Sequence, residues 1–354
     1  MAKQLVVERR YDLDWLRVCS IGLLLVYHAA IAFQPWGRFL GFITSNQSWE
    51  AVWVPMTMLN IWRIPLLFFV AGMAVYYAIC RRSWKAFLAE RCRRIVLPYC
   101  TGIFLVVPLQ CFLVQRYYGI ALEYQAQPAH CWFLGNLLVY MLLLLPIFYG
   151  IKKKAIADRI QALNTRFNRW LFILAMLIVV WIEIEWINPP IFELYAFTMH
   201  GFFLGFLAFV FGYIMGLIGI PLWQDLSKAW WLILLLAFCL YSNRVQHFPG
   251  KIGPLFWALE SFSWILALLG VGYRYLNRPG KHLAYLGKAA LPVYIIHLFM
   301  QFLASILVLS LPLASWLQYL LVVVLTASFS LGCYEYLIRR FAFTRLLFGV
   351  NSKN

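Results

Sequence analysis

The chain has 354 residues, of which 64% are hydrophobic and only 12% charged, and its mean hydropathy is +0.78. Soluble domains are about half apolar and a quarter charged, so this composition excludes a water-soluble globular protein and indicates a polytopic helical membrane protein. The net charge of +17 fits either nucleic-acid binding or a gathering of Lys and Arg in cytoplasmic loops. The placement of the charges along the chain distinguishes these two interpretations.

Apolar segments long enough to cross a bilayer recur along the whole chain. A spanning helix needs about 20 predominantly apolar residues, and about ten segments meet this condition. They lie near 15–34, 53–79, 94–115, 131–150, 169–187, 198–220, 228–242, 254–275, 284–308 and 315–338. Pro65 and Pro292 fall inside the second and ninth segments and predict a break in each. The connections are short, so we expect residues 1–354 to form a single all-α transmembrane domain.

The cations alternate between connections. Both ends of the chain and every second connection carry nearly all of them, whereas the opposite connections carry only Arg38, Arg116, Arg244 and Lys251. By the positive-inside rule this pattern predicts that both termini are cytoplasmic, and it explains the net charge without nucleic acid. The eight cysteines form no CxxC pair and no zinc-type spacing with histidine, so we predict no metal.

The first apolar helix carries two polar groups, Arg17 and His28. Eleven residues turn a helix by about 20° beyond three full turns and rise about 16 Å, so the two side chains share one face. With a cytoplasmic amino terminus, Arg17 lies at the cytoplasmic mouth and His28 near the bilayer centre, where an ionisable group usually faces a cavity. A structural interpretation, with His28 bonded between helices and Arg17 reaching headgroups, stays open. The shared stripe favours function.

Further cations have competing interpretations. Arg91 and Arg94 are neighbours on a helix face, and their planar forks suit phosphate oxygens, although they also fit an ordinary cytoplasmic loop. Arg63 lies inside the second helix and needs a partner or water at that depth. It either pairs with Glu260 or Glu335, or anchors an anionic acyl group.

The remaining candidates lie on later helices. Tyr294 and His297 are three residues apart and share a face, so they line either a site or a helix contact. Trp132 and His130 lie at the start of the fourth helix. Trp132 is either an interfacial residue or a platform on which a sugar stacks. Glu260 or Glu335 is a candidate to orient His28, as carboxylates orient imidazoles in other enzymes.

Five stretches, in order along the chain, resemble the acyltransferase-3 family of integral membrane acyltransferases. The family's first helix carries an arginine, ten residues and a histidine, as do Arg17 and His28 here. The stretches are "LDWLRVCSIGLLLVYH" (13–28), "LLFFVAGMAVYY" (66–77), "FLAERCRRIVLPY" (87–99), "HCWFLGNLLVYML" (130–142) and "LPVYIIHLF" (291–299). The start "RYDLDWLRV" and the short loops are most similar to the branch called glucans biosynthesis protein C, whose members succinylate periplasmic glucans.

The resemblance implies an acyl-CoA-dependent O-acyltransferase of the bacterial inner membrane. Arg17, Arg91 and Arg94 would hold the phosphates of the donor, and His28 would act as general base on a glycan hydroxyl. A covalent acyl-His28 intermediate is the alternative chemistry. Arg63 and Tyr294 are candidates to stabilise the oxyanion. The donor is succinyl-CoA or acetyl-CoA, and the other expected partner is membrane lipid. A secondary transporter or polymer exporter and a scaffold without chemistry remain alternatives, and the oligomeric state is left open.

Overall fold

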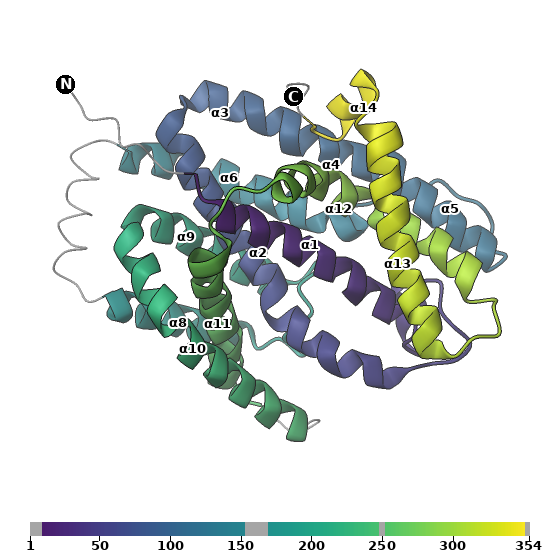
Figure 1. The fold of residues 1–354 in the computed structure, drawn as a ribbon, viewed down its shortest axis with the longest axis horizontal. Helices are drawn as coiled ribbons and strands as arrows, with labels where there is room; N and C mark the ends of the chain where they lie inside the picture. The colour runs from purple at the N-terminus through teal and green to yellow at the C-terminus, as the bar shows by residue number, and fades with distance from the viewer. Residues whose placement is uncertain (1–8, 153–168, 248–251, 351–354) are drawn as a thin grey trace. The chain divides into compact units, whose positions relative to one another are not determined.

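The computed structural model describes residues 9–152, 169–247 and 252–350, and within these ranges it is helical without β-strands (Figure 1). Ten segments of this described part are long and apolar enough to cross a membrane. The all-α class and the number of spans are therefore confirmed. The spans are Tyr11–Ile31, Glu50–Arg81, Trp84–Tyr117, Ala129–Ile151, Arg169–Ile187, Met199–Ile218, Ile220–Gln246, Pro254–Leu276, Lys281–Val308 and Ser315–Ile338.

Each helix within these spans has its own label, and short 3-10 or π turns separate some of the helices. They are α1 (Tyr11–Ile31), α2 (Trp53–Arg81), α3 (Trp84–Arg91), α4 (Leu97–Thr101), α5 (Val107–Tyr117), α6 (Trp132–Ile151), α8 (Arg169–Ile187), α9 (Met199–Ile218), α10 (Ile220–Gln246), α11 (Pro254–Val271), α12 (Lys281–Val308) and α13 (Ser315–Cys333), followed by the short α14 (Ala342–Leu347).

Several boundaries differ from the predicted ones. Helix α1 begins at Tyr11, with Asp12 and Asp14 in its first turn, where acidic side chains favour the helix dipole. The same helix ends at Ile31 rather than at residue 34, so His28 lies in its last turn and not near its middle. The third span begins at Trp84 rather than at residue 94, and α10 extends to Gln246 rather than ending at residue 242.

The predicted break at Pro65 is wrong, because α2 runs through this proline. Proline lacks the N–H that would bond to the carbonyl four residues earlier, which here belongs to Ile61. That carbonyl instead accepts hydrogen bonds from Ser261 Oγ at 2.8 Å and from Tyr195 Oη at 3.2 Å. Two side chains thus replace the missing donor, and the helix continues.

The break predicted at Pro292 is also wrong, since α12 is continuous from Lys281 to Val308. The third span does depart from α geometry, with π turns at Cys92–Val96 and Gly102–Val106. Pro108 follows the second of these turns. Pro108 has no N–H to donate to the carbonyl of Phe104, and this carbonyl accepts a hydrogen bond from Tyr124 Oη at 2.9 Å. Such π turns are frequent at functional sites.

The chain forms two compact units. The first unit comprises Met1–Arg17, Ile61–Phe87 and Val139–Ala284, and the second comprises Val18–Asn60, Leu88–Leu138 and Tyr285–Asn354. The prediction of a single domain over 1–354 stays a prediction.

Glycines allow α2 and α9 to approach closely in the first unit. A Cβ on Gly72 would lie 1.9 Å from the carbonyl oxygen of Phe209, and one on Gly212 would lie 2.0 Å from that of Phe69. Small residues at such crossings are the usual solution inside membranes, where close backbone contact supplies the packing energy.

In the second unit, the end of α1 packs on α12. Ala29 and Ala304 belong to one buried cluster with Val308 and Val322. Gln301 of α12 donates from Nε2 to the carbonyl oxygen of His28 at 2.9 Å. These contacts fix the last turn of α1 against the C-terminal part of α12.

Candidate active site

Two histidines, from α1 and α12, meet inside the second unit. His28 Nδ1 lies 2.8 Å from His297 Nε2. The two rings are within 4° of parallel and their centroids are 5.1 Å apart. A short N–N distance with widely spaced centroids means that the rings lie end to end in one plane, which is the geometry of an N–H···N hydrogen bond. His297 is fully buried and His28 is half-buried.

The backbone fixes which nitrogens carry protons in this pair. His297 Nδ1 lies 2.6 Å from the carbonyl oxygen of Tyr294. A carbonyl only accepts, so this Nδ1 carries a proton, and in neutral His297 the Nε2 atom is the acceptor. The proton between the rings therefore belongs to His28 Nδ1. Neutral His28 then has its lone pair on Nε2, which is the form that a general base requires.

A third histidine, His130, is tied to the same part of α12. It lies in the 3-10 turn Ala129–Cys131 before α6, is 9% exposed, and its ring centroid is 5.2 Å from that of His297. His130 Nε2 donates to the carbonyl oxygen of Ile295 at 2.8 Å. In return, Tyr294 Oη donates to the carbonyl oxygen of His130. The Tyr294 hydroxyl thus holds the turn before α6, and its role at an oxyanion stays a prediction.

The three arginines predicted to hold phosphate are on helical segments. Arg17, in the first unit, donates from Nη2 to Asp14 Oδ1 at 3.2 Å, and its side chain is 42% exposed. In the second unit, Arg94 Nη1 lies 3.5 Å from Glu90 Oε1, with 44% exposure, and Arg91 is half-buried. Pairs this exposed contribute little stability, so a phosphate group can compete for these guanidinium groups.

The C-terminal turn supports the Arg94 segment. Gly349 has φ of +67°, and a Cβ there would lie 3.2 Å from Arg94 Cα and 2.8 Å from Pro98 Cγ. Thr101 Oγ1 donates to the carbonyl oxygen of Leu347 at 3.1 Å. The chain after α14 therefore packs on the main chain of the predicted phosphate-binding arginine.

Among the other predicted residues, Glu260 lies in the first unit, and both of its carboxylate oxygens accept from Arg244, at 2.7 and 2.9 Å. Glu335 pairs with Arg339 at 2.7 Å on the surface. Arg63 is buried in the first unit with 1% exposure, and Trp132 is half-buried at the start of α6. The partner that the structure gives to His28 Nδ1 is His297, so an imidazole holds the place predicted for a carboxylate.

The family model for the acyltransferase-3 type of acyltransferase domain matches residues 10–335. The chain belongs to the acyltransferase-3 family. Neither the curated proteins nor the solved structures gave a match. Family membership and the ten spans together identify a multi-pass membrane acyltransferase. Residues 28, 130 and 297 lie inside the matched range, whereas the C-terminal turn after residue 335 lies outside it.

This acyltransferase also has buried charges that the sequence analysis missed. Arg244, near the end of α10, binds Glu260 and also Glu193, which lies 3.1 Å from its Nη1 atom. His200 Nδ1 lies 3.0 Å from Glu183 Oε1, and both side chains are almost fully buried. The alternation of cations had placed Arg244 in a solvated connection, because α10 was predicted to end before it.

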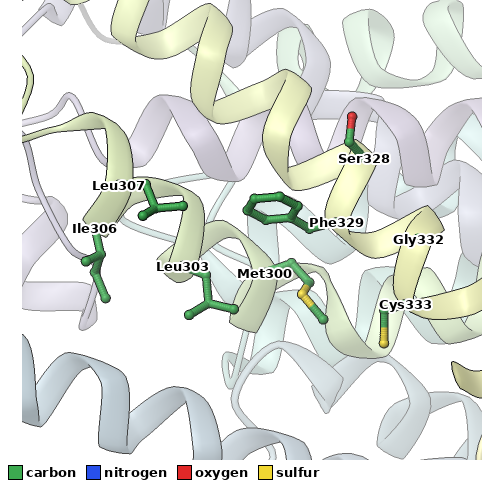
Figure 2. A pocket seen from close by; sticks show the side chains of 8 residues that line it. All are labelled: Met300, Leu303, Ile306, Leu307, Ser328, Phe329, Gly332 and Cys333. Carbon is green, nitrogen blue, oxygen red and sulfur yellow. The ribbon is translucent and has the colours of Figure 1, made fainter. Parts of the chain in front are cut away.

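A groove between α12 and α13 of the acyltransferase has a different character (Figure 2). It measures about 550 Å³ and is nearly all apolar. Figure 2 shows Phe329 directed from α13 toward α12. The lining has no His, acid or amine, so the groove suits hydrocarbon chains and not acyl-transfer chemistry. Its residues are Met300, Leu303, Ile306, Leu307, Ser328, Phe329, Gly332 and Cys333.

Proposed function

We propose that this membrane acyltransferase moves an acyl group from cytoplasmic acyl-CoA to a hydroxyl of a periplasmic glycan, with His28 as general base. The observation that carries the proposal is the histidine pair in which the buried His297, oriented by the carbonyl of Tyr294, accepts the Nδ1 proton of His28. We propose the bacterial inner membrane as its location, and a glucan as the acceptor on the resemblance to the glucan-modifying branch.

The chemistry follows from the protonation of His28. Its Nε2 atom takes the proton of the acceptor hydroxyl while the hydroxyl oxygen attacks the thioester carbonyl. The tetrahedral intermediate then collapses, the C–S bond breaks, and the thiolate of CoA takes the proton back from His28. During this cycle the imidazolium is stabilised through Nδ1–H by His297. General base catalysis of this kind typically contributes about 10²- to 10⁴-fold in rate.

The donor is held by cations in this proposal. Arg17, Arg91 and Arg94 bind the phosphates of CoA, since guanidinium forks match phosphate oxygens. The rise of about 16 Å along α1 between Arg17 and His28 is comparable with an extended pantetheine arm. Succinyl-CoA is the favoured donor, with Arg63 as the partner of its free carboxylate, and acetyl-CoA is the alternative.

Transfer of a labelled acyl group tests the proposal. Purified protein in lipid nanodiscs is given succinyl-CoA or acetyl-CoA, labelled in the acyl group, and a gluco-oligosaccharide. We expect label on the oligosaccharide, with succinyl-CoA preferred, and we expect Arg63→Gln to reduce this preference. Uptake of unmodified oligosaccharide into proteoliposomes, without label transfer from either donor, would contradict the proposal and favour a transporter.

A further inference from the structure

The segment between α5 and α6 turns back along the third span. Residues 120–128 have no helix or strand. Gln115 Oε1 accepts a hydrogen bond from the backbone N–H of Glu123 at 3.0 Å, and Gln115 Nε2 donates to the carbonyl oxygen of Glu123 at 3.2 Å. Tyr124 Oη donates to the carbonyl oxygen of Phe104, a residue that precedes α5 in the third span. The chain therefore returns toward the middle of the span that it has just left.

The returning segment, residues 120–128, ends beside the centre of the third span. A Cβ on Gly102 would lie 2.8 Å from Cys131 Sγ, so the turn before α6 packs against Gly102. Fifteen residues separate Gly102 from Tyr117 at the end of α5, which corresponds to about 22 Å of helix. Gly102 lies close to the midpoint of the span Trp84–Tyr117.

Non-helical backbone at this depth cannot face lipid, because its N–H and C=O groups would lack hydrogen-bond partners there. It occurs only where protein covers it or where it lines a water-filled cavity. Residues 119–127 are exposed, so the described part of the chain does not cover them. The segment consequently borders water.

At the inner end of this segment lies His130. Its Nε2 atom bonds to the carbonyl of Ile295, which requires the proton there and places the lone pair of the neutral ring on Nδ1. This Nδ1 atom is buried and has no hydrogen-bond partner among the described residues. A buried acceptor without a donor is costly, and the ring lies beside His297. The site thus calls for a ligand that donates a hydrogen bond.

We propose that residues 119–128 line an aqueous entrance for the acceptor, and that His130 Nδ1 accepts a hydrogen bond from an acceptor hydroxyl. The inference rests on the proposed function, and it assigns a polyhydroxylated acceptor to this entrance. His130 binds and orients the acceptor while His28 takes the proton of the reacting hydroxyl.

Two substitutions of His130 distinguish the donor role of its Nε2 atom from the acceptor role of its Nδ1 atom. Glutamine places its amide as many bonds from Cβ as Nε2, so His130→Gln keeps a donor for Ile295 but loses the acceptor at Nδ1. His130→Asn keeps an acceptor at the position of Nδ1 but loses the donor for Ile295. We expect His130→Gln to melt close to wild type and to raise the KM for a gluco-oligosaccharide roughly tenfold, as for one lost hydrogen bond, with the donor KM unchanged. We expect His130→Asn to keep acceptor binding and to melt at a lower temperature.

Equilibrium binding of labelled gluco-oligosaccharide without donor is measured beside turnover. Weaker binding by His130→Gln supports the inference. Unchanged binding and KM in His130→Gln, with wild type active, would mean that Nδ1 meets only water and would overturn the inference alone. Failure of wild type to transfer label from either donor would instead overturn the proposed function.

The aqueous entrance has its own test in a pair of cysteines. Tyr124 and Leu142 are both 61% exposed, but Leu142 lies in the middle of α6. A water-soluble, membrane-impermeant maleimide should label Tyr124→Cys and not Leu142→Cys, as read by mass spectrometry at each position, and excess oligosaccharide should slow the labelling. Equal labelling of the two, or none at either, would contradict a water-filled entrance.

Discussion

Each unit contains a buried polar cluster, and these two clusters are held together in different ways. In the first unit Arg244 binds Glu260 through two hydrogen bonds and Glu193 through a third, so one cation is held between two carboxylates. In the second unit the imidazoles of His130 and His297 are buried and bond to backbone carbonyls. A buried ion pair is held charged, because separating it leaves an uncompensated ion.

The difference assigns different roles to the two polar interiors. The Arg–Glu cluster locks α10 to α11 through ion pairs. A neutral imidazole can accept a proton, and the bond from His28 to His297 leaves the lone pair of neutral His28 on Nε2. We therefore expect changes in the first cluster to act on stability and changes in the second to act on the rate of transfer.

Breaking the ionic cluster should have the largest effect. Arg244→Gln leaves Glu260 and Glu193 without their cation and should lower the free energy of unfolding by about 3–5 kcal/mol. The matched control is Arg339→Gln, because Arg339 and Glu335 form a similar pair on the surface. Thermal unfolding in nanodiscs measures both variants, and equal melting temperatures for the two would contradict the structural role of the cluster.

Substitutions of His297 should act on catalysis. Glutamine can place an oxygen where Nε2 accepts the proton of His28, whereas asparagine reaches only the position of Nδ1. We expect His297→Asn to lower kcat by roughly 10- to 100-fold, as for a lost hydrogen bond to a charged group, and His297→Gln to retain more activity. The comparison is made at saturating donor and acceptor. If both variants lose the same activity, His297 does not orient His28 through Nε2.

The pH dependence of stability sharpens the comparison further. Burial raises the pKa of Glu193, and the charge of Arg244 opposes this rise. In Arg244→Gln the pKa should rise further. A carboxyl group with a raised folded-state pKa contributes stability that is present below its unfolded pKa and lost as the pH rises through its folded pKa. The destabilisation should therefore be smallest in acid and grow toward neutral pH, and a pH-independent difference in melting temperature would refute this linkage.

A smaller effect is expected at the C-terminal turn. Gly349→Ala introduces a Cβ at positive φ and close to Arg94, which costs about 1–2 kcal/mol in the left-handed region. We expect the donor KM to rise about threefold to tenfold while kcat is unchanged. Gly280→Ala is the control, since no atom lies within 4 Å of the added Cβ. A donor KM that does not differ between the two variants would show that the turn does not support donor binding.

The spans could be predicted from sequence because each is a local property of about 20 apolar residues. The same holds for the stripe of Arg17 and His28, since one helix carries both. The pairing of His28 with His297 joins residues 269 positions apart, and only the resemblance suggested that His297 lines the site. No local pattern indicates which helices meet, so the tautomer imposed by the carbonyl of Tyr294 lay beyond prediction.

The missed features have similar physical causes. Pro65 predicts a break because its own sequence lacks a donor for Ile61. Ser261 of α11 and Tyr195, in the connection between α8 and α9, supply the donors instead. Arg244 was assigned to a connection because α10 becomes polar toward its end, and Glu193 and Glu260 compensate that polarity only in the folded protein. The returning segment before His130 has an ordinary loop composition, and only its contacts with Gln115, Phe104 and Gly102 reveal its depth.

The central claim, that His28 is the proton acceptor in transfer, is tested most directly with purified His28→Ala. Label transfer from acyl-CoA to oligosaccharide is measured against wild type, beside the melting temperature and the binding of CoA. The account predicts a loss of transfer of about 10²-fold or more, with melting and CoA binding close to wild type. Retention of most of the transfer activity by this variant would contradict it.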